Sequence, residues 1–216
     1  YDKLILSPGA APVRPPLEGI DSEGIFTLRN VNDTDRVKEY IEENDVKRAL
    51  IVGAGFIGLE MAENLHEYGI QVSVVEMADQ VMTPVDYEIA TVVHQHFKSK
   101  GVGLHLQEAV TAFRPVEDGI DVVLKSGLVL QVDMVLLSIG VRPDVKLARE
   151  AGLEIGETGG IKVNEFLQTS HPDIYAVGDA IEFPNPVSGH PSLAFLAGPA
   201  NKQGRICADN VVNGNH

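Results

Sequence analysis

The 216-residue sequence has one cysteine, no tryptophan, few basic side chains and no long apolar run. Cys207 alone can form neither an internal disulfide nor a cysteine-based zinc site. With 17 basic against 31 acidic residues the formal net charge is −14, which argues against partners such as nucleic acid and membrane surfaces. No apolar segment approaches the ~18 residues that a membrane span needs. The 44% hydrophobic content is that of an ordinary globular protein.

A strand, a glycine-rich turn and a helix follow one another in the middle of the sequence. The apolar run 47–52 leads into Gly53, Gly55 and Gly58, and Gly69 ends the helix that follows. In a dinucleotide site the first glycine permits the tight turn, the second lets the backbone approach the pyrophosphate, and the third lets helix and strand pack closely. The anion would meet free N–H groups at the positive end of the helix. The pattern therefore predicts a dinucleotide site.

Glu76 ends the next apolar strand, 72–76, roughly 20 residues after the glycine turn, where such sites carry an acid. A carboxylate there can accept hydrogen bonds from both ribose hydroxyls, and it would repel a 2′-phosphate. The segment 77–85 contains no Arg or Lys that could pair with a phosphate. We therefore predict NAD(H) in preference to NADP(H).

The other periodic segments predict an α/β fold. We expect helices over 33–43, capped by Asp33 or Thr34, and over 83–100, starting at Thr83-Pro84. Three short strands joined by tight glycine turns predict an antiparallel meander, and a last helix is expected to begin near Pro199. The strands of the meander are 110–116, 120–124 and 128–132, followed by a strand 133–139 that is buried on both faces. The residues expected on the buried helix faces are Val37, Tyr40 and Ile41, then Ile57, Met61, Leu65 and Tyr68, then Ile89, Val92, Val93 and Phe97.

Four further segments resemble a single protein family, in that family's order. They are YDKLILSPGA (1–10), IGVRPD (139–144), IYAVGDA (174–180) and LAGPANKQGRICADN (196–210). Together with the glycine turn they resemble the pyridine nucleotide-disulfide oxidoreductases, closest to the branch with coenzyme A-disulfide reductase, NADH oxidase and NADH peroxidase. The resemblance covers essentially the whole chain. It implies an FAD/NAD(P)-binding, Rossmann-like α/β fold, with a central parallel sheet, helices and the antiparallel meander.

The resemblance also implies a domain division, because in that family the NAD domain is inserted into the FAD domain. Residues 1–45 and 167–216 would be segments of the FAD domain, and 46–166 would be the NAD domain. Since the sequence starts on Tyr1 within an apolar run, we expect it to be a piece of a longer protein. The FAD-binding glycine fingerprint and a redox cysteine are expected before Tyr1, and a dimerisation domain after His216.

Several site residues follow from the resemblance alone. Those implied to contact FAD are Ser7, Pro8, Gly9, Ala10, Arg29, Asp179 and Ala197, and those implied to contact NAD through their backbone are Ile57 and Gly140. Phe56 would cover the flavin until nicotinamide displaces it, and Glu60 would face the flavin as in some members of the family. Each has a plainer interpretation: Asp179 as a turn residue, 7–10 as a strand end, Arg29 as a surface charge, Phe56 as helix packing and Glu60 as solvated surface.

The expected function is hydride transfer from NADH to FAD, followed by electron transfer to a cysteine centre that reduces a small-molecule disulfide, a peroxide or oxygen. No catalytic residue is expected in this piece, and no metal, because the histidines are scattered. Cys207 is expected to be a small buried side chain. We expect a cytoplasmic homodimer as the parent, and a piece that binds NAD(H) weakly, retains little FAD and turns nothing over. The alternatives are a stand-alone NAD(H)-binding sensor and an ordinary NAD-dependent dehydrogenase.

Overall fold

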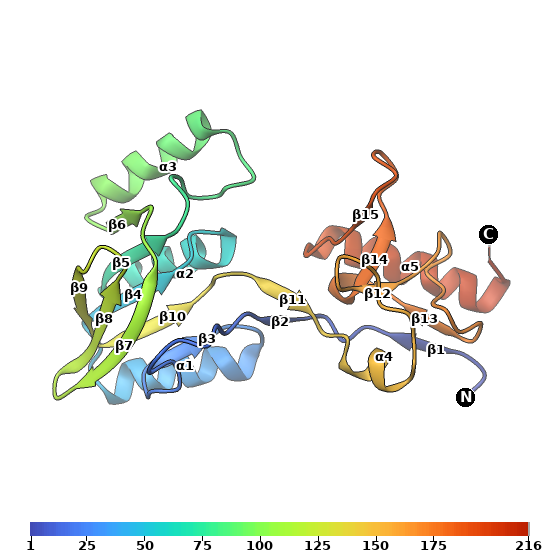
Figure 1. The fold of residues 1–216 in the computed structure, drawn as a ribbon, viewed down its shortest axis with the longest axis horizontal. Helices are drawn as coiled ribbons and strands as arrows, with labels where there is room; N and C mark the ends of the chain where they lie inside the picture. The colour runs from blue at the N-terminus through green and yellow to red at the C-terminus, as the bar shows by residue number, and fades with distance from the viewer. Residues whose placement is uncertain (216) are drawn as a thin grey trace. The chain divides into compact units, whose positions relative to one another are not determined.

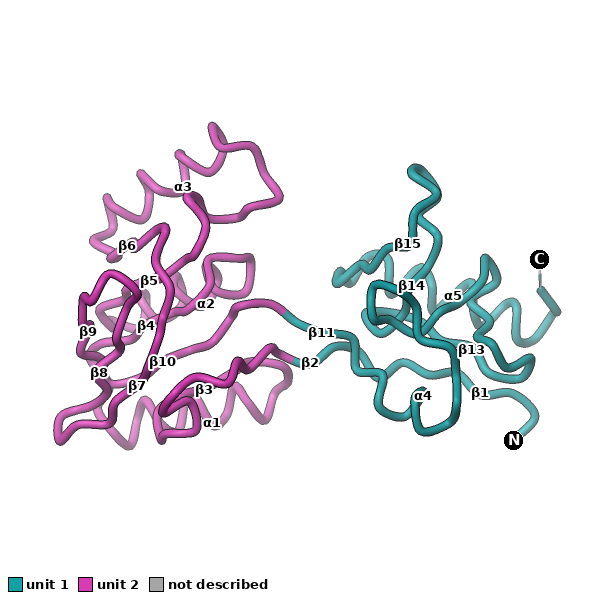
Figure 2. The backbone as a smooth tube through the Cα atoms, viewed as in Figure 1, with its two compact units in different colours: residues 1–11, 141–216 teal, residues 12–140 magenta. Residues whose placement is uncertain are grey.

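A computed structural model describes residues 1–215. In it the chain folds into two compact units (Figures 1 and 2). Unit 2 is the continuous segment Pro12–Gly140, and unit 1 combines Tyr1–Ala11 with the residues from Val141 on. None of the helices in residues 1–215 combines the length and the apolar composition that a membrane crossing requires.

Unit 2 contains a five-stranded parallel sheet with the strand order β3-β10-β4-β5-β6. The strands are β3 (Ile25–Thr27), β4 (Arg48–Val52), β5 (Gln71–Glu76), β6 (Gly103–Leu106) and β10 (Met134–Leu137). The helices of the unit are α1 (Val31–Glu43), α2 (Phe56–Glu67) and α3 (Tyr87–Ser99). A separate antiparallel sheet is formed by β7 (Val110–Val116), β8 (Gly119–Leu124) and β9 (Val129–Val132), which confirms the predicted meander.

The two faces of the parallel sheet pack against different partners. Side chains alternate across a strand, so Ile51, on one face, packs with residues of the three helices. Leu50, on the other face, packs with Phe113 and Val122 of the meander. Burial on both faces explains why Met134–Leu137 is a continuous apolar run, as the sequence predicted.

Unit 1 is built around the parallel pair β1 (Leu4–Leu6) and β13 (Ile174–Ala176). A short 3₁₀ helix, η1 (Gly178–Ala180), follows β13. A second sheet contains β12 (Ile161–Lys162), β14 (Ile181–Pro184) and β15 (Pro191–Ser192). The helices are α4 (Lys146–Glu150) and α5 (Ala197–Asn213), and β2 (Ala10–Pro12) pairs with β11 (Val141–Pro143) where the chain passes from one unit to the other.

The boundaries of the two units differ from the expected domain boundaries. Residues 12–45 lie in unit 2, because β3 adds an edge strand to its sheet beside β10. Residues 141–166 lie in unit 1, because Ala148 and Ile161 belong to its hydrophobic core.

Two predicted helix starts are wrong. The cap of α1 is Asn30, whose side chain accepts a hydrogen bond from the Asp33 N–H, while the Asp33 carboxylate accepts one from the Asn30 N–H; Thr34 does not cap the helix. Helix α3 begins at Tyr87, because the residues from Thr83 to Asp86 belong to a loop. The last helix, α5, starts at Ala197, two residues before Pro199.

The predicted buried faces of α2 and α3 are also wrong in part. In α3, Ile89 and Val92 are 58% and 64% exposed, whereas Ala90, His94 and Phe97 are buried. In α2, Ile57 is exposed and Leu65 is buried, and Tyr68, the C-cap residue, is exposed. In α1, Val37 and Ile41 are buried as predicted, and Tyr40 is partly buried.

Candidate dinucleotide-binding site

Gly53 makes the tight turn at the end of β4. Its φ is +101°, and its N–H donates a hydrogen bond to the Val75 carbonyl at 2.8 Å. A Cβ at this position would lie 2.5 Å from the Ser138 carbonyl oxygen. Both the left-handed backbone and the close approach of β10 therefore require glycine.

Gly55 and Gly58 meet different surroundings. Gly55 is the N-cap of α2, and a Cβ there would have nothing within 4 Å, so its backbone faces open space. A Cβ on Gly58 would lie 2.5 Å from the Ser138 hydroxyl oxygen, so this glycine lets α2 pack against the end of β10. The Ser138 hydroxyl donates to the carbonyl of Gly53 at 2.9 Å and thereby holds the turn.

The Glu76 carboxylate is fixed at the end of β5, beside the glycine turn. One oxygen, Oε2, accepts from the Ala54 N–H at 2.8 Å, and Oε1 accepts from the Ala78 N–H at 2.9 Å. A carboxylate has about four acceptor positions, so two bonds leave capacity for hydroxyl donors. Within residues 1–215 no cationic side chain forms an ion pair with Glu76.

A cavity of about 520 Å³ opens at the carboxyl ends of β4, β5 and β10. Cavities of this size commonly bind small molecules. From β4 the chain continues to β5 and β6 on one side, whereas β10 lies on the other side, and ligands in such sheets usually bind at this point of reversal. It brings together four predicted residues: Gly53, Gly55, Glu76 and Gly140. Among the described residues, neither Lys nor Arg lines it.

Other lining residues were not predicted from the sequence. Pro15 and Leu17 come from the proline-rich segment before β3, and Val110 and Phe113 come from the meander. Glu108 follows β6 and adds a second carboxylate to the lining. The only sequence signal for these residues is the general rule that ligands bind beyond the carboxyl ends of parallel strands.

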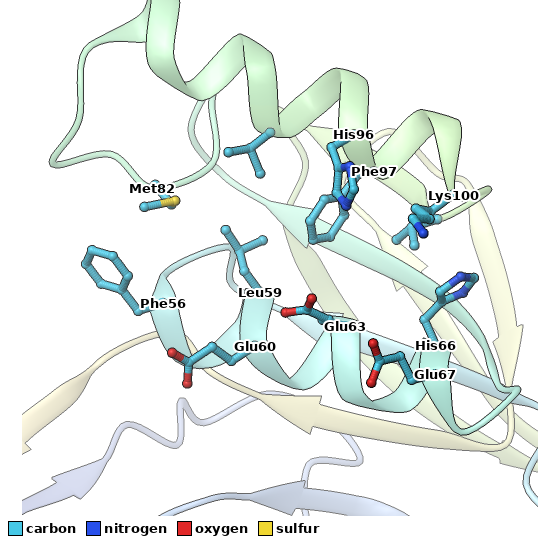
Figure 3. A pocket seen from close by; sticks show the side chains of 12 residues that line it. Phe56, Leu59, Glu60, Glu63, His66, Glu67, Met82, His96, Phe97 and Lys100 are labelled. Carbon is cyan, nitrogen blue, oxygen red and sulfur yellow. The ribbon is translucent and has the colours of Figure 1, made fainter.

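Phe56, Ile57 and Gly58 do not line this cavity. Phe56, a residue that is 55% exposed, lines a second cavity of about 460 Å³ between α2 and α3, where its ring lies opposite Met82 (Figure 3). Glu60, one turn further along α2, lines the same second cavity (Figure 3). Gly140 keeps a left-handed φ of +110°, and its carbonyl accepts from the Val13 N–H at 2.9 Å.

In unit 1 several residues implied to contact FAD lie at one edge. Ser7, Pro8 and Gly9 follow β1, and Asp179 follows β13; the two strands are parallel neighbours, so their carboxyl ends coincide. The Val177 N–H donates to the Leu6 carbonyl at 3.0 Å, which holds the two chain ends together. Ala10 starts β2.

Helix α5 is tied to the same edge. It starts at Ala197, and its Gln203 side chain accepts from the Gly178 N–H at 2.9 Å. Arg29 lies in unit 2, before α1, where its backbone N–H donates to Asp33. It is therefore not part of the cluster within unit 1.

Cys207 is fully buried in the core of unit 1, and burial raises the pKa of its thiol. This agrees with the predicted structural role. Within residues 1–215 no group of three or more His, Cys, Asp and Glu side chains is arranged to hold a metal ion.

Comparison with known proteins finds relatives that match almost the whole chain. A relative named NADH oxidase, from Methanocaldococcus jannaschii, is 40% identical over 213 residues, which are 98% of this chain and 47% of the relative. A coenzyme A disulfide reductase of Staphylococcus haemolyticus is 34% identical over 212 residues, again 98% of this chain and 47% of the relative. The chain thus spans about half the length of these relatives.

Solved structures agree with the sequence comparison. The structure of reduced Bacillus anthracis CoADR-RHD matches with a TM-score of 0.95 and 52% identity, over 99% of this chain and 38% of that chain. An NAD-dependent persulfide reductase from A. fulgidus matches with a TM-score of 0.95 and 39% identity, over 100% of this chain and 40% of that chain. The family model described as pyridine nucleotide-disulphide oxidoreductase matches residues 1–200, and the chain therefore belongs to that family.

Proposed function

We propose that this chain is the NADH-binding part of an FAD-dependent oxidoreductase. The whole protein would pass hydride from NADH to FAD and then electrons to a cysteine centre, which reduces a disulfide such as coenzyme A disulfide, a peroxide or oxygen. Unit 2 would bind NADH, and unit 1 would contribute part of the FAD site. The parent is proposed to be a cytoplasmic homodimer.

The observation that carries the proposal is the fixed Glu76 carboxylate in a cavity without cationic side chains. Glu76 and the glycine turn at the start of α2 line the same cavity. A dinucleotide bound there could place its pyrophosphate at the N-terminus of α2 and its ribose beside the Glu76 carboxylate. A 2′-phosphate placed there would meet Glu76 and Glu108 and no lining Lys or Arg. This favours NADH over NADPH.

The relatives whose names state an electron donor agree on a nicotinamide nucleotide, some naming NADH and others NAD(P)H, and the names differ more in the acceptor. They include a water-forming NADH oxidase from Lactobacillus brevis whose structure was solved with NADH bound, at 29% identity and a TM-score of 0.89. Others are named coenzyme A disulfide reductase and NAD(P)H coenzyme A polysulfide/persulfide reductase. Since these names differ in their acceptors, the proposal covers both sulfur compounds and oxygen.

The residues present at the edge of unit 1 fit a flavin dinucleotide. Gly9 has a φ of +73° and nothing within 4 Å of its Cβ position, so the backbone after β1 is open to a ligand. Asp179, at the neighbouring strand end, offers a carboxylate to a ribityl hydroxyl. When bound, FAD supplies the two-electron acceptor; the residues of this chain bind and orient it. We retain the expectation that the exposed ring of Phe56 covers the flavin.

Calorimetric titration of the chain with NADH and with NADPH tests the proposal. We expect saturable binding of NADH, weaker binding of NADPH, and little retained flavin in the purified chain. No binding of either nucleotide would contradict the assignment of unit 2, and equal affinities would contradict the preference for NADH. The sensor alternative is tested by the gene: a second glycine fingerprint and a cysteine codon upstream of Tyr1 support the oxidoreductase.

A further inference from the structure

The loop between β5 and α3, residues 77–86, is folded onto the glycine turn. The Met82 N–H donates to the carbonyl of Ala54 at 2.9 Å, and the Val85 N–H donates to the Met82 carbonyl at 2.9 Å. Met82 has a φ of +50°, a conformation that a non-glycine residue adopts only when its surroundings hold it there. Figure 3 shows Met82 opposite Phe56 at the start of α2.

The loop holds the peptide groups of Ala54 from one side while Glu76 holds them from the other. Ala54 lies between Gly53 and Gly55, its N–H donates to the Glu76 carboxylate at 2.8 Å, and its carbonyl accepts from Met82. The orientation of the turn that faces the cavity thus depends on where Met82 lies.

The residue next to Met82 is held by a buried histidine of α3. The Val81 N–H donates to Nε2 of His94 at 3.1 Å, Val81 is 0% exposed, and His94 is 9% exposed. Because Nε2 accepts this bond, it carries no proton, and a neutral imidazole then carries its proton on Nδ1. A continuous chain of contacts therefore runs from His94 through Val81 and Met82 to Ala54.

We propose that His94 is a positioning residue for the dinucleotide site, acting through the loop 77–86 on the Ala54 peptide. The proposal rests on the proposed function, because it assigns the turn to nucleotide binding. His94 would not contact the nucleotide itself. It would fix the backbone of Ala54, which belongs to the turn proposed to contact the nucleotide.

Protonation of His94 removes the acceptor and leaves a buried N–H without a partner, which is costly. Burial of the ring, and next the positive charge of Lys98, lower the pKa of His94 from its usual 6.5. From its own helix the ring is faced by Lys98 and by the ring of Tyr87, whose centroid is 6.3 Å away; from the loop it is faced by the uncharged Val81 N–H. The neutral, loop-holding form thus persists below the pH at which an exposed histidine is half protonated.

The test compares His94→Leu, which removes the acceptor, with His94→Gln, whose amide oxygen can accept from Val81 but does not titrate. His96→Gln is the matched control, an exposed histidine on the same helix. The probe is NAD⁺, titrated calorimetrically at about pH 7.5 and about pH 5.5, above the sequence pI of ≈ 4.8. Amide hydrogen exchange at Val81 and Met82 is measured without nucleotide.

At about pH 7.5 we expect His94→Leu to bind NAD⁺ about tenfold more weakly than wild type, as loss of a buried hydrogen bond implies. His94→Gln, which keeps an acceptor for the Val81 N–H, and the control His96→Gln should bind within about twofold of wild type. A loss of wild-type affinity at about pH 5.5 that His94→Gln does not share would support the proposal further. If His94→Leu fails to fold, His94→Asn, whose amide is too short to reach the Val81 N–H, replaces it. Unchanged NAD⁺ affinity in the variant without the acceptor, or an equally weakened affinity in His94→Gln, overturns the proposal. Absence of NAD⁺ binding by wild type contradicts the proposed function. In that case, faster amide exchange at Val81 in His94→Leu would still show that His94 holds the loop 77–86.

Discussion

The α-carbon of Gly58 faces the carbonyl oxygen of Gly53 so closely that a Cβ on residue 58 would lie 2.1 Å from that oxygen. Such a contact is far inside van der Waals separation, and both partners are backbone or helix atoms that cannot move aside freely. The third glycine of the turn is therefore a packing requirement of unit 2, whereas Gly55 has no such neighbour.

This difference predicts opposite phenotypes for two alanine substitutions. Gly58→Ala should lower the free energy of unfolding by about 1–3 kcal/mol, the usual cost of overpacking. Gly55→Ala should change it by less, within about 1 kcal/mol, yet weaken NADH binding, because its methyl group stands where the backbone would approach the pyrophosphate. Urea denaturation and NADH titration of both variants measure this. A stable Gly58→Ala protein would contradict the packing argument.

Glu76→Arg should reverse or abolish the preference for NADH. The substitution removes the acceptor for the ribose hydroxyls and introduces a cation that can pair with a 2′-phosphate. We expect the ratio of the NADPH Kd to the NADH Kd to fall by about tenfold or more. Glu117→Arg, an exposed position in the β7–β8 hairpin, changes the net charge equally and controls for long-range electrostatics. A ratio that stays at the wild-type value in Glu76→Arg would exclude a ribose role for this carboxylate.

The glycine turn and Glu76 could be predicted from the sequence because their geometry is local. Each follows directly from a strand end or a helix start, and the structure brings them to one cavity with Gly140. The loop 77–86 could not be predicted, since the left-handed φ of Met82 depends on its bond to Ala54, far away in sequence.

The errors in α3 have the same origin. Thr83, Pro84 and Asp86 provide good local signals for a helix start, but tertiary bonds hold the preceding loop in another conformation. The helix then buries Ala90 and His94 and leaves Ile89 and Val92 exposed, a rotation that apolar periodicity alone could not reveal because His94 counts as polar. The meander residue Phe113 was missed as a lining residue because its approach is set by packing between sheets.

The ion pair of Arg48 with Asp133 predicts an acid-sensitive step in the stability of unit 2. Burial opposes ionisation of Asp133, but bonds from Arg48 and from the Lys47 and Arg48 N–H groups outweigh it and lower the carboxyl pKa below its usual 3.8. The folded state therefore binds this proton less readily than the unfolded state. The stabilisation is present above about pH 4 and is lost as the pH falls through the lowered pKa.

Asp133→Asn isolates that contribution. The variant should lose about 1–3 kcal/mol of stability near pH 6, because a charge-assisted network is replaced by weaker bonds, and the difference from wild type should shrink as the pH falls towards 3. Urea denaturation at low protein concentration across this range measures both curves. Asp118→Asn, whose backbone carbonyl rather than side chain contacts Arg48, serves as the matched control. Parallel curves for Asp133→Asn and wild type would show that Asp133 is not the titrating group.

Cys207 is predicted to be unreactive in the folded chain. Its side chain is 0% exposed on α5 and packs in the core of unit 1, and burial raises the thiol pKa, so both access and thiolate formation are suppressed. An aromatic disulfide reagent should modify it slowly in buffer and rapidly in concentrated urea. Cys207→Ala should cost less stability than Cys207→Ser, because the serine would bury a hydroxyl in an apolar core. Modification in buffer at the rate of a free cysteine would mean that the thiol is accessible and would contradict the structural role of Cys207.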